Sequence, residues 1–106
     1  MDAALRAIAE PRRRQILALV RVDELSAGEI ALHFDVTRPA ISQHLTVLKE
    51  AGLLRERRDG TRRLYLAVPK ALDELRRFLE DFWDDRLATL KRAAEAKERT
   101  KHGRRR

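Results

Sequence analysis

The sequence has no cysteine among its 106 residues, which excludes disulfide bonds, thiolate metal sites and cysteine nucleophiles. Aromatic residues make up only 5%, so leucine, isoleucine, valine and alanine must form the core. No apolar run approaches the length that spans a bilayer, and the N-terminus lacks a signal-peptide pattern. We therefore expect one domain that lies in the cytoplasm and makes no membrane contact.

The positive charge of the chain is unevenly distributed. Its net charge is +7 at pH 7. Residues 37–67 carry seven basic groups against three acidic ones, and residues 99–106 carry five basic groups and no acidic group. The other segments are close to neutral. Two separate basic segments are typical of a protein that binds nucleic acid.

Residues 26–52 have the signals of two short helices joined by a tight turn. Ser26 and Glu29 match a capping box, in which each side chain bonds a free backbone N–H at the start of a helix. Thr37 is a credible N-cap for the second helix, with Pro39 in its first turn. Apolar residues recur at helical spacing and define the buried face of this second helix: Ile41, Leu45 and Leu48. The pattern predicts a helix-turn-helix.

The exposed face of the second helix carries side chains that can read DNA bases. In a helix-turn-helix this helix enters the major groove, where arginine can bond guanine, glutamine can bond adenine, and serine can serve several bases or a phosphate. We expect the following residues to contact DNA: Thr37, Arg38, Pro39, Ser42, Gln43, His44 and Thr46. His44 lies beside the core face, so a packing role is equally open for it. The alternative for the whole set is an ordinary exposed helix face.

A basic hairpin follows. Residues 53–58 and 62–68 are typical of two strands around the turn signal Asp59-Gly60. The hairpin carries five arginines that we expect to meet phosphates or enter a minor groove: Arg55, Arg57, Arg58, Arg62 and Arg63. Like charges at this density repel one another unless a polyanion is bound. The alternative is a hairpin that only adds solubility.

A long helix over about residues 70–99 has an apolar stripe with a seven-residue character. A monomer of this size cannot cover so long a stripe, so we expect a second copy to bury it. The predicted dimer interface consists of Leu72, Leu75, Leu79, Phe82, Trp83, Leu87 and Leu90. A twofold dimer would present two recognition helices about one DNA turn apart. The alternative is that the helix folds back on its own domain. Residues 100–106 are expected to form a basic tail that is disordered without a partner.

Together these elements predict a mainly α fold with a small β-hairpin. It is a winged helix-turn-helix with a long C-terminal dimerisation helix over residues 1–99, followed by the tail. The leading functional hypothesis is a homodimeric, sequence-specific transcriptional regulator that binds operator DNA. The alternatives are a nonspecific, architectural DNA binder driven by the tail and a winged-helix protein-interaction module. The sequence has no serine–histidine–aspartate, paired-carboxylate or phosphate-loop arrangement, so we expect no enzyme, cofactor or metal site.

Several stretches of the chain resemble one known family. They are AEPRRRQIL at residues 9–17, LSAGEIALHFDVTRPAISQHLTVLKEAGLL at residues 25–54, and RRDGTRRLYL at residues 57–66. They resemble the arsenical-resistance-operon repressor (ArsR) family of bacteria and archaea, and the likeness covers about residues 3–95. The run Phe82-Trp83-Asp84-Asp85-Arg86-Leu87 is similar to a subgroup whose last helix reads Phe-Trp-Asp/Glu-x-Arg-Leu. The resemblance implies a winged-helix homodimer that represses transcription at an operator, often that of its own operon.

The chain departs from the sensor members of that family. Thiol-based sensors place cysteines near the second or third helix, and here there are none. Metal sensors that use the last helix show Asp-x-His, ten residues, and then His-x-x-Glu or His. If Asp84 is aligned to that pattern, Arg86 and Lys97 stand at the histidine positions and Thr100 at the last one. These departures from the family patterns imply that the chain is neither a metal sensor nor an arsenical sensor of these kinds. The sequence does not identify its effector.

Overall fold

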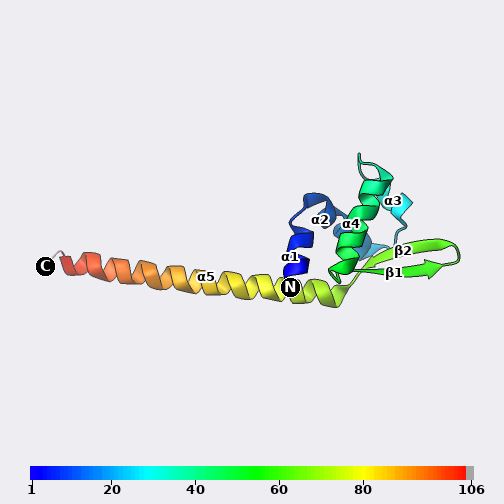
Figure 1. Ribbon diagram of the computed structural model, residues 1–106. Helices are drawn as coiled ribbons and strands as arrows, with labels where there is room; N and C mark the ends of the chain where they lie inside the picture. The colour runs from blue at the N-terminus through cyan, green and yellow to red at the C-terminus, as the bar shows by residue number, and fades with distance from the viewer. Residues whose placement is uncertain (105–106) are drawn as a thin grey trace. The chain divides into compact units, whose positions relative to one another are not determined.

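The protein folds as helices α1 to α4, a two-stranded hairpin, and a last helix, α5 (Figure 1). The structure is a computed structural model that describes the backbone of residues 1–104 and the side chains of residues 1–98. Two units can be distinguished along the chain, one up to Leu75 and one from Arg76 onward. The elements are α1 (Asp2–Ile8), α2 (Pro11–Val22), α3 (Ala27–Ala31), α4 (Arg38–Glu50), β1 (Leu54–Asp59), β2 (Arg62–Ala67) and α5 (Pro69–Arg104).

The helix boundaries follow local capping signals. The predicted capping box is confirmed, because the Glu29 N–H donates to the Ser26 hydroxyl and the Ser26 N–H donates to the Glu29 carboxylate. Thr37 caps α4 by accepting from the Ala40 N–H at 3.3 Å, which confirms that prediction too. Gly52 follows α4 with a φ of 80°, a conformation that a side chain would strain.

Helix α4 is the centre of the first unit. It packs against α1, α2, α3 and β1. Its predicted buried face is confirmed, since Ile41, Leu45 and Leu48 are each at most 2% exposed. They join a core drawn from every element of this unit, whose other fully buried large side chains are Ile16, Val20, Ile30 and Leu53. Burial of each large aliphatic side chain contributes about 1.5–3 kcal/mol, so α4 is firmly held on one face.

The hairpin turns at the Asp59-Gly60 signal, and β1 ends one residue later than the pattern predicted. Asp59 pairs with Arg62 in the antiparallel register, so Gly60 and Thr61 form the loop. Gly60 has a φ of 65°, and no residue other than glycine has a positive φ among those that the structure describes. A loop with a positive φ only at its first position suits a type II′ turn.

The base of the hairpin is fastened to both ends of the helix-turn-helix. Leu25, just before α3, exchanges backbone hydrogen bonds with Tyr65 of β2 at 2.8 and 3.2 Å. At the other end, the Lys49 ammonium of α4 donates to the Glu56 carboxylate of β1 at 2.6 Å. Figure 1 shows the hairpin extending beyond the helices of the first unit. These two attachments set the position of the hairpin relative to α4.

The first residues of helix α5 belong to the core of the first unit. Leu75 is 5% exposed and Leu72 is partly buried, and both pack against the core of their own protomer. Leu75 therefore has little surface left for a second copy, and the predicted place of Leu72 in a dimer interface stays a prediction. The helix continues to Arg104, beyond its predicted end near residue 99. The side chains of residues 99–106 lie outside the described part, so the predicted disorder of the tail stays a prediction. Within the described residues, no helix is long and apolar enough to cross a membrane.

We expect Glu56→Gln to destabilise the protein in a pH-dependent way. The hydrogen bond from Lys49 holds the pKa of Glu56 below its ordinary value of 4.5, and the same bond raises the pKa of Lys49 above 10.5. The lowered pKa of Glu56 stabilises the fold above its ordinary value, and this contribution is lost as the pH falls through the folded value. The raised pKa of Lys49 stabilises the fold below 10.5 and is lost at higher pH.

Urea unfolding of wild type and variant across pH measures this effect. The variant should be less stable at neutral pH, and the difference should shrink as the pH falls below 4.5 through the folded pKa of Glu56. It should also shrink as the pH rises above 10.5 through the folded pKa of Lys49, without vanishing, because Arg63 also lies 3.3 Å from Glu56. Glu80→Gln is the matched control, because its pair with Arg76 is 2.8 Å long but more than half exposed on both sides. A stability difference for Glu56→Gln that stays constant down to pH 3 would contradict the ion-pair explanation.

Candidate nucleic-acid interface

The outward face of α4 is polar and open to solvent. Arg38, Pro39, Ser42, Gln43 and Thr46 are all exposed, as the helical wheel predicted. The Thr46 hydroxyl donates to the Ser42 carbonyl at 3.0 Å, so its hydrogen is used within the helix. Thr37 uses a lone pair as the N-cap, which leaves its hydroxyl hydrogen available to an external acceptor. The face therefore offers amide, guanidinium and hydroxyl groups side by side.

Arg38 lies where α3 and α4 approach each other. A Cβ atom built on Gly28 would lie 3.9 Å from the Arg38 guanidinium carbon, so the arginine side chain covers the first turn of α3. Among the described residues Arg38 has no ion-pair partner, and its charge is not neutralised within the protomer. Its donors remain available to a base edge or a phosphate.

His44 faces the body of the first unit and not the outward face of α4. Its side chain is 18% exposed, and Nε2 lies 4.0 Å from the Glu10 carboxylate. Its Nδ1 lies 3.5 Å from a guanidinium nitrogen of Arg13. Of the two roles left open for His44, this geometry favours packing. The histidine joins the recognition helix to the start of α2.

Two arginines at the start of α2 have a structural role that the sequence reasoning missed. Arg13 donates to the backbone carbonyls of Ala7 and Arg6 at 2.6 and 3.1 Å, and Arg14 donates to the carbonyl of Ile8. These carbonyls lie at the C-terminal end of α1, where the last carbonyls of a helix lack partners within the helix, and that of Arg6 also accepts from the Ala9 N–H at 3.3 Å. A signal was present, because the helix dipole disfavours cations in a first turn. Three consecutive arginines there indicate partners outside the helix.

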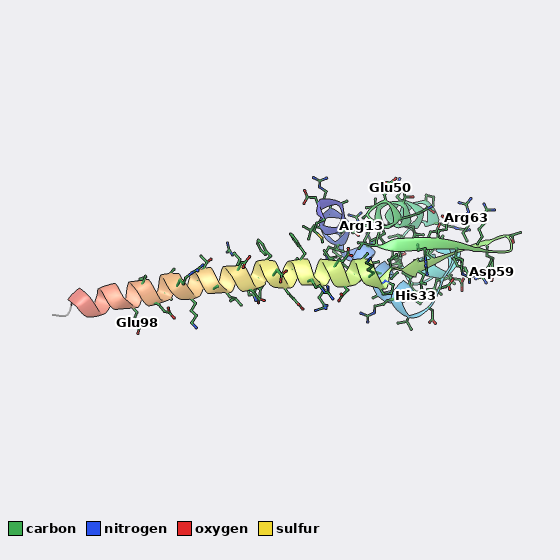
Figure 2. The ribbon with its side chains drawn as sticks, turned by 90° about the horizontal axis from the view of Figure 1, so that it is seen from below. Arg13, His33, Glu50, Asp59, Arg63 and Glu98 are labelled. Atoms are coloured by element: carbon green, nitrogen blue, oxygen red, sulfur yellow. The ribbon has the colours of Figure 1, made fainter. Side chains whose placement is uncertain are left out.

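The five arginines of the hairpin, which we call the wing arginines (Arg55, Arg57, Arg58, Arg62 and Arg63), are all exposed, but three of them are paired. The Arg57 Nε donates to Glu24 at 2.8 Å, Arg62 bonds Glu29, and the Arg63 Nε lies 3.3 Å from Glu56. The expected mutual repulsion is therefore largely relieved by carboxylates, without a bound polyanion. Among the described residues, Arg55 and Arg58 have no ion-pair partner. Figure 2 shows Arg63 on the hairpin and Asp59 near its end.

These pairs shift the pKa values of their members. The hydrogen bond to Glu24 raises the pKa of Arg57. The pKa of Glu29 is lowered first by the backbone N–H and hydroxyl of Ser26, and further by Arg62. Glu29 is therefore a carboxylate with two roles, as a helix cap and as an acidic partner of the wing. It is fully charged at neutral pH.

The second unit presents an apolar stripe. The predicted interface residues Leu79, Phe82, Trp83, Leu87 and Leu90 are between 41 and 58% exposed. Figure 2 draws the side chains of α5 as far as Glu98. Phe78, which the prediction did not include, is also 41% exposed beside this stripe. Exposed aromatic and aliphatic side chains in one row indicate a surface that associates with another one.

No group of three or more histidine, aspartate or glutamate side chains in the described part of the chain is arranged to hold a metal ion. Asp84, which was aligned above to the sensor pattern, lies on the exposed surface of α5.

Comparison with known proteins gives consistent matches. Residues 10–56 match the family described as "Bacterial regulatory protein, arsR family". The chain is 45% identical over 82 residues to the HTH-type transcriptional regulator Rv2034 of Mycobacterium tuberculosis, covering 77% of both chains. It is 42% identical over 60 residues to the transcriptional repressor SdpR of Bacillus subtilis, covering 57% of this chain and 67% of that one.

A solved structure shares the fold. The homodimeric winged helix-turn-helix DNA-binding domain of Mb0332 from Mycobacterium bovis, described as a possible ArsR-family regulator, superposes with a TM-score of 0.65. It is 30% identical, and the match covers 79% of this chain and 78% of that one. Sequence and fold agree with the arrangement of α3, α4 and the hairpin, and the chain belongs to the arsR family of bacterial regulatory proteins.

Proposed function

We propose that the protein is a homodimeric transcriptional repressor that acts in the cytoplasm and binds a palindromic operator, with that of its own operon among its targets. The observation that carries this proposal is the two-sided character of α4. One face is buried in the core, and the other offers Arg38, Ser42 and Gln43 to solvent beside the basic hairpin. Its relative SdpR is named a repressor, and the Mb0332 domain is named homodimeric and DNA-binding.

The outward face of α4 supplies the base contacts. Arg38 can donate two hydrogen bonds to a guanine and Gln43 can pair with an adenine in the major groove. Ser42 and the hydroxyl of Thr37 can bond a base edge or a phosphate. The wing arginines Arg55 and Arg58, which have no ion-pair partner among the described residues, supply phosphate contacts at the side of the site.

The apolar stripe of α5 supplies the contact between the two copies. Phe82 and Trp83 are each more than half exposed, and a parallel or antiparallel second copy of the same stripe would bury them. A twofold dimer places two copies of α4 on successive major grooves, so the operator should have two inverted half-sites.

The first experiment is a titration of the protein against its own upstream intergenic DNA and against a scrambled duplex, over a range of salt concentrations. We expect tight binding to the first duplex that persists in salt, and weak, strongly salt-dependent binding to the second. Equal, salt-labile binding to both duplexes and no enrichment of a motif in random-site selection would support the architectural alternative. Loss of all binding on deletion of residues 100–106 would support it too.

Arg38→Ala and Gln43→Ala should each weaken operator binding by roughly 1–3 kcal/mol and relax the preference at one base pair of each half-site. Arg21→Ala and Gln15→Ala are matched controls, because they remove the same side chains from exposed positions on α2. Fluorescence anisotropy with a set of single-base operator variants measures both effects. Unchanged affinity and unchanged base preference in both α4 variants would remove the assignment of this helix to base reading and favour the protein-interaction alternative.

Substitution of both Leu79 and Trp83 by glutamate should give monomers and sharply weaken operator binding. The two carboxylates would be buried without partners in the proposed interface. The free-energy cost of burying these charges exceeds the free energy gained from the contact between the two copies. Ala88→Glu is the control, since this exposed residue lies on the opposite side of α5 from the stripe. Light scattering gives the mass of each variant. A stable dimer of the doubly substituted protein would show that another surface joins the two copies.

A further inference from the structure

Two carboxylates from the helical part of the first unit lie against the wing arginines. Glu24 follows α2, and Glu29 lies in the first turn of α3. Glu24 accepts from Arg57 at 2.8 Å, and Glu29 accepts from Arg62. Each pair joins residues 33 positions apart in the sequence, so these contacts exist only because the hairpin is seated beside α3.

The two pairs lie on the same face of the hairpin. Arg62 is directly opposite Asp59, and Arg57 is two residues before Asp59 on the same strand. Opposite residues and residues two apart share a face of an antiparallel pair. Arg58 is directly opposite Arg63 and therefore lies on the other face. Arg55, Arg57 and Arg62 therefore share one face of the hairpin, where body carboxylates pair the last two, and Arg58 lies on the other face.

Both pairs are accessible to solvent and to a polyanion. The side chains of Arg57 and Arg62 are 55 and 54% exposed, and those of Glu24 and Glu29 are 31 and 42% exposed. Glu29 stays charged because the backbone N–H of Ser26 holds it at the N-terminus of α3, where the helix dipole also favours a negative charge. A phosphate approaching either arginine therefore meets a fixed carboxylate at the same guanidinium.

We propose that Glu24 and Glu29 act as internal counter-ions that hold Arg57 and Arg62 back from the DNA backbone and leave Arg55 and Arg58 to make the phosphate contacts of the wing. The proposal rests on the DNA-binding function proposed above. A guanidinium paired with a carboxylate has little net charge, so it releases few counter-ions on meeting a phosphate. The carboxylates therefore lower the affinity for every duplex and make binding less sensitive to salt, which leaves a larger share of the affinity to the base contacts of α4.

The test is the salt dependence of DNA binding in Glu24→Gln, Glu29→Gln and the double variant. Glutamine can replace glutamate in a capping box, so Glu29→Gln keeps the cap of α3 while it removes the charge. Each variant should bind operator and scrambled duplexes about two- to fivefold more tightly, as expected for release of one exposed ion pair. The slope of log affinity against log salt should become steeper by up to about 0.9 for each freed arginine.

A double-mutant cycle assigns the effect to one arginine. Arg57→Gln should change the affinity of the wild type little, but it should cancel the gain produced by Glu24→Gln. Glu80→Gln is the charge-matched control, because it removes one negative charge and one ion pair on α5 and frees no wing arginine. Thermal unfolding checks that all variants remain folded.

Two outcomes would overturn the proposal. Weaker DNA binding by a folded double variant would mean that the carboxylates position the arginines for DNA, and an unchanged salt slope would mean that Arg57 and Arg62 never reach phosphates. The variant Arg58→Gln distinguishes these two outcomes from a failure of the proposed DNA-binding function. It should weaken binding to both duplexes and reduce the salt slope by about 0.9 if the wing contacts DNA. If Arg58→Gln has no effect, the wing is not part of the interface, and the proposal fails with it.

Discussion

The burial of one face of α4 is the constraint on which the arrangement of the molecule depends. Ile41, Leu45 and Leu48 fix the rotation of this helix about its axis, because they fill the core between α1, α2, α3 and β1. Because those three residues are buried, helical geometry places Ser42, Gln43 and Thr46 on the outward face of α4. A core substitution such as Leu45→Ala would therefore disturb the outward face as well as cost about 2–5 kcal/mol of stability.

The hairpin is placed relative to that face by polar contacts of two kinds. The backbone pairing of Leu25 with Tyr65 attaches β2 to the segment before α3, and Glu56 connects β1 to the last turn of α4 through Lys49. These contacts act at the base of the hairpin, where packing excludes part of the solvent. The arginines farther along are matched with Glu24 and Glu29, which limits the repulsion of a dense cationic surface. The carboxylates that reduce the repulsion between these arginines in the free protein also reduce the attraction of the hairpin for a polyanion.

The sequence predicted what depends on short-range signals and on periodicity. The capping box at Ser26, the N-cap at Thr37 and the buried face of α4 involve residues no more than seven positions apart, and all are confirmed. Contacts between distant segments were not predictable in this way. Nothing local links Arg57 to Glu24, or His44 to Arg13, because those partners meet only after the core has formed. The register of the hairpin was not predictable either, since the same Asp-Gly pair permits more than one pairing of the two strands.

Helix α5 shows that an apolar periodic pattern does not reveal which surface covers it. The stripe from Leu72 to Leu90 is continuous in sequence, yet Leu75 is 5% exposed and Trp83 is 58% exposed. The early residues are covered by the core of their own protomer, whereas Leu79 and the apolar residues after it are between 41 and 58% exposed. Apolar periodicity predicts that one face of a helix is covered by another apolar surface. Whether that surface belongs to the same chain or to a second copy depends on how far the core of the protomer extends along the helix. Here that limit falls at Leu75, so changes before it should affect folding, and changes beyond it should affect assembly.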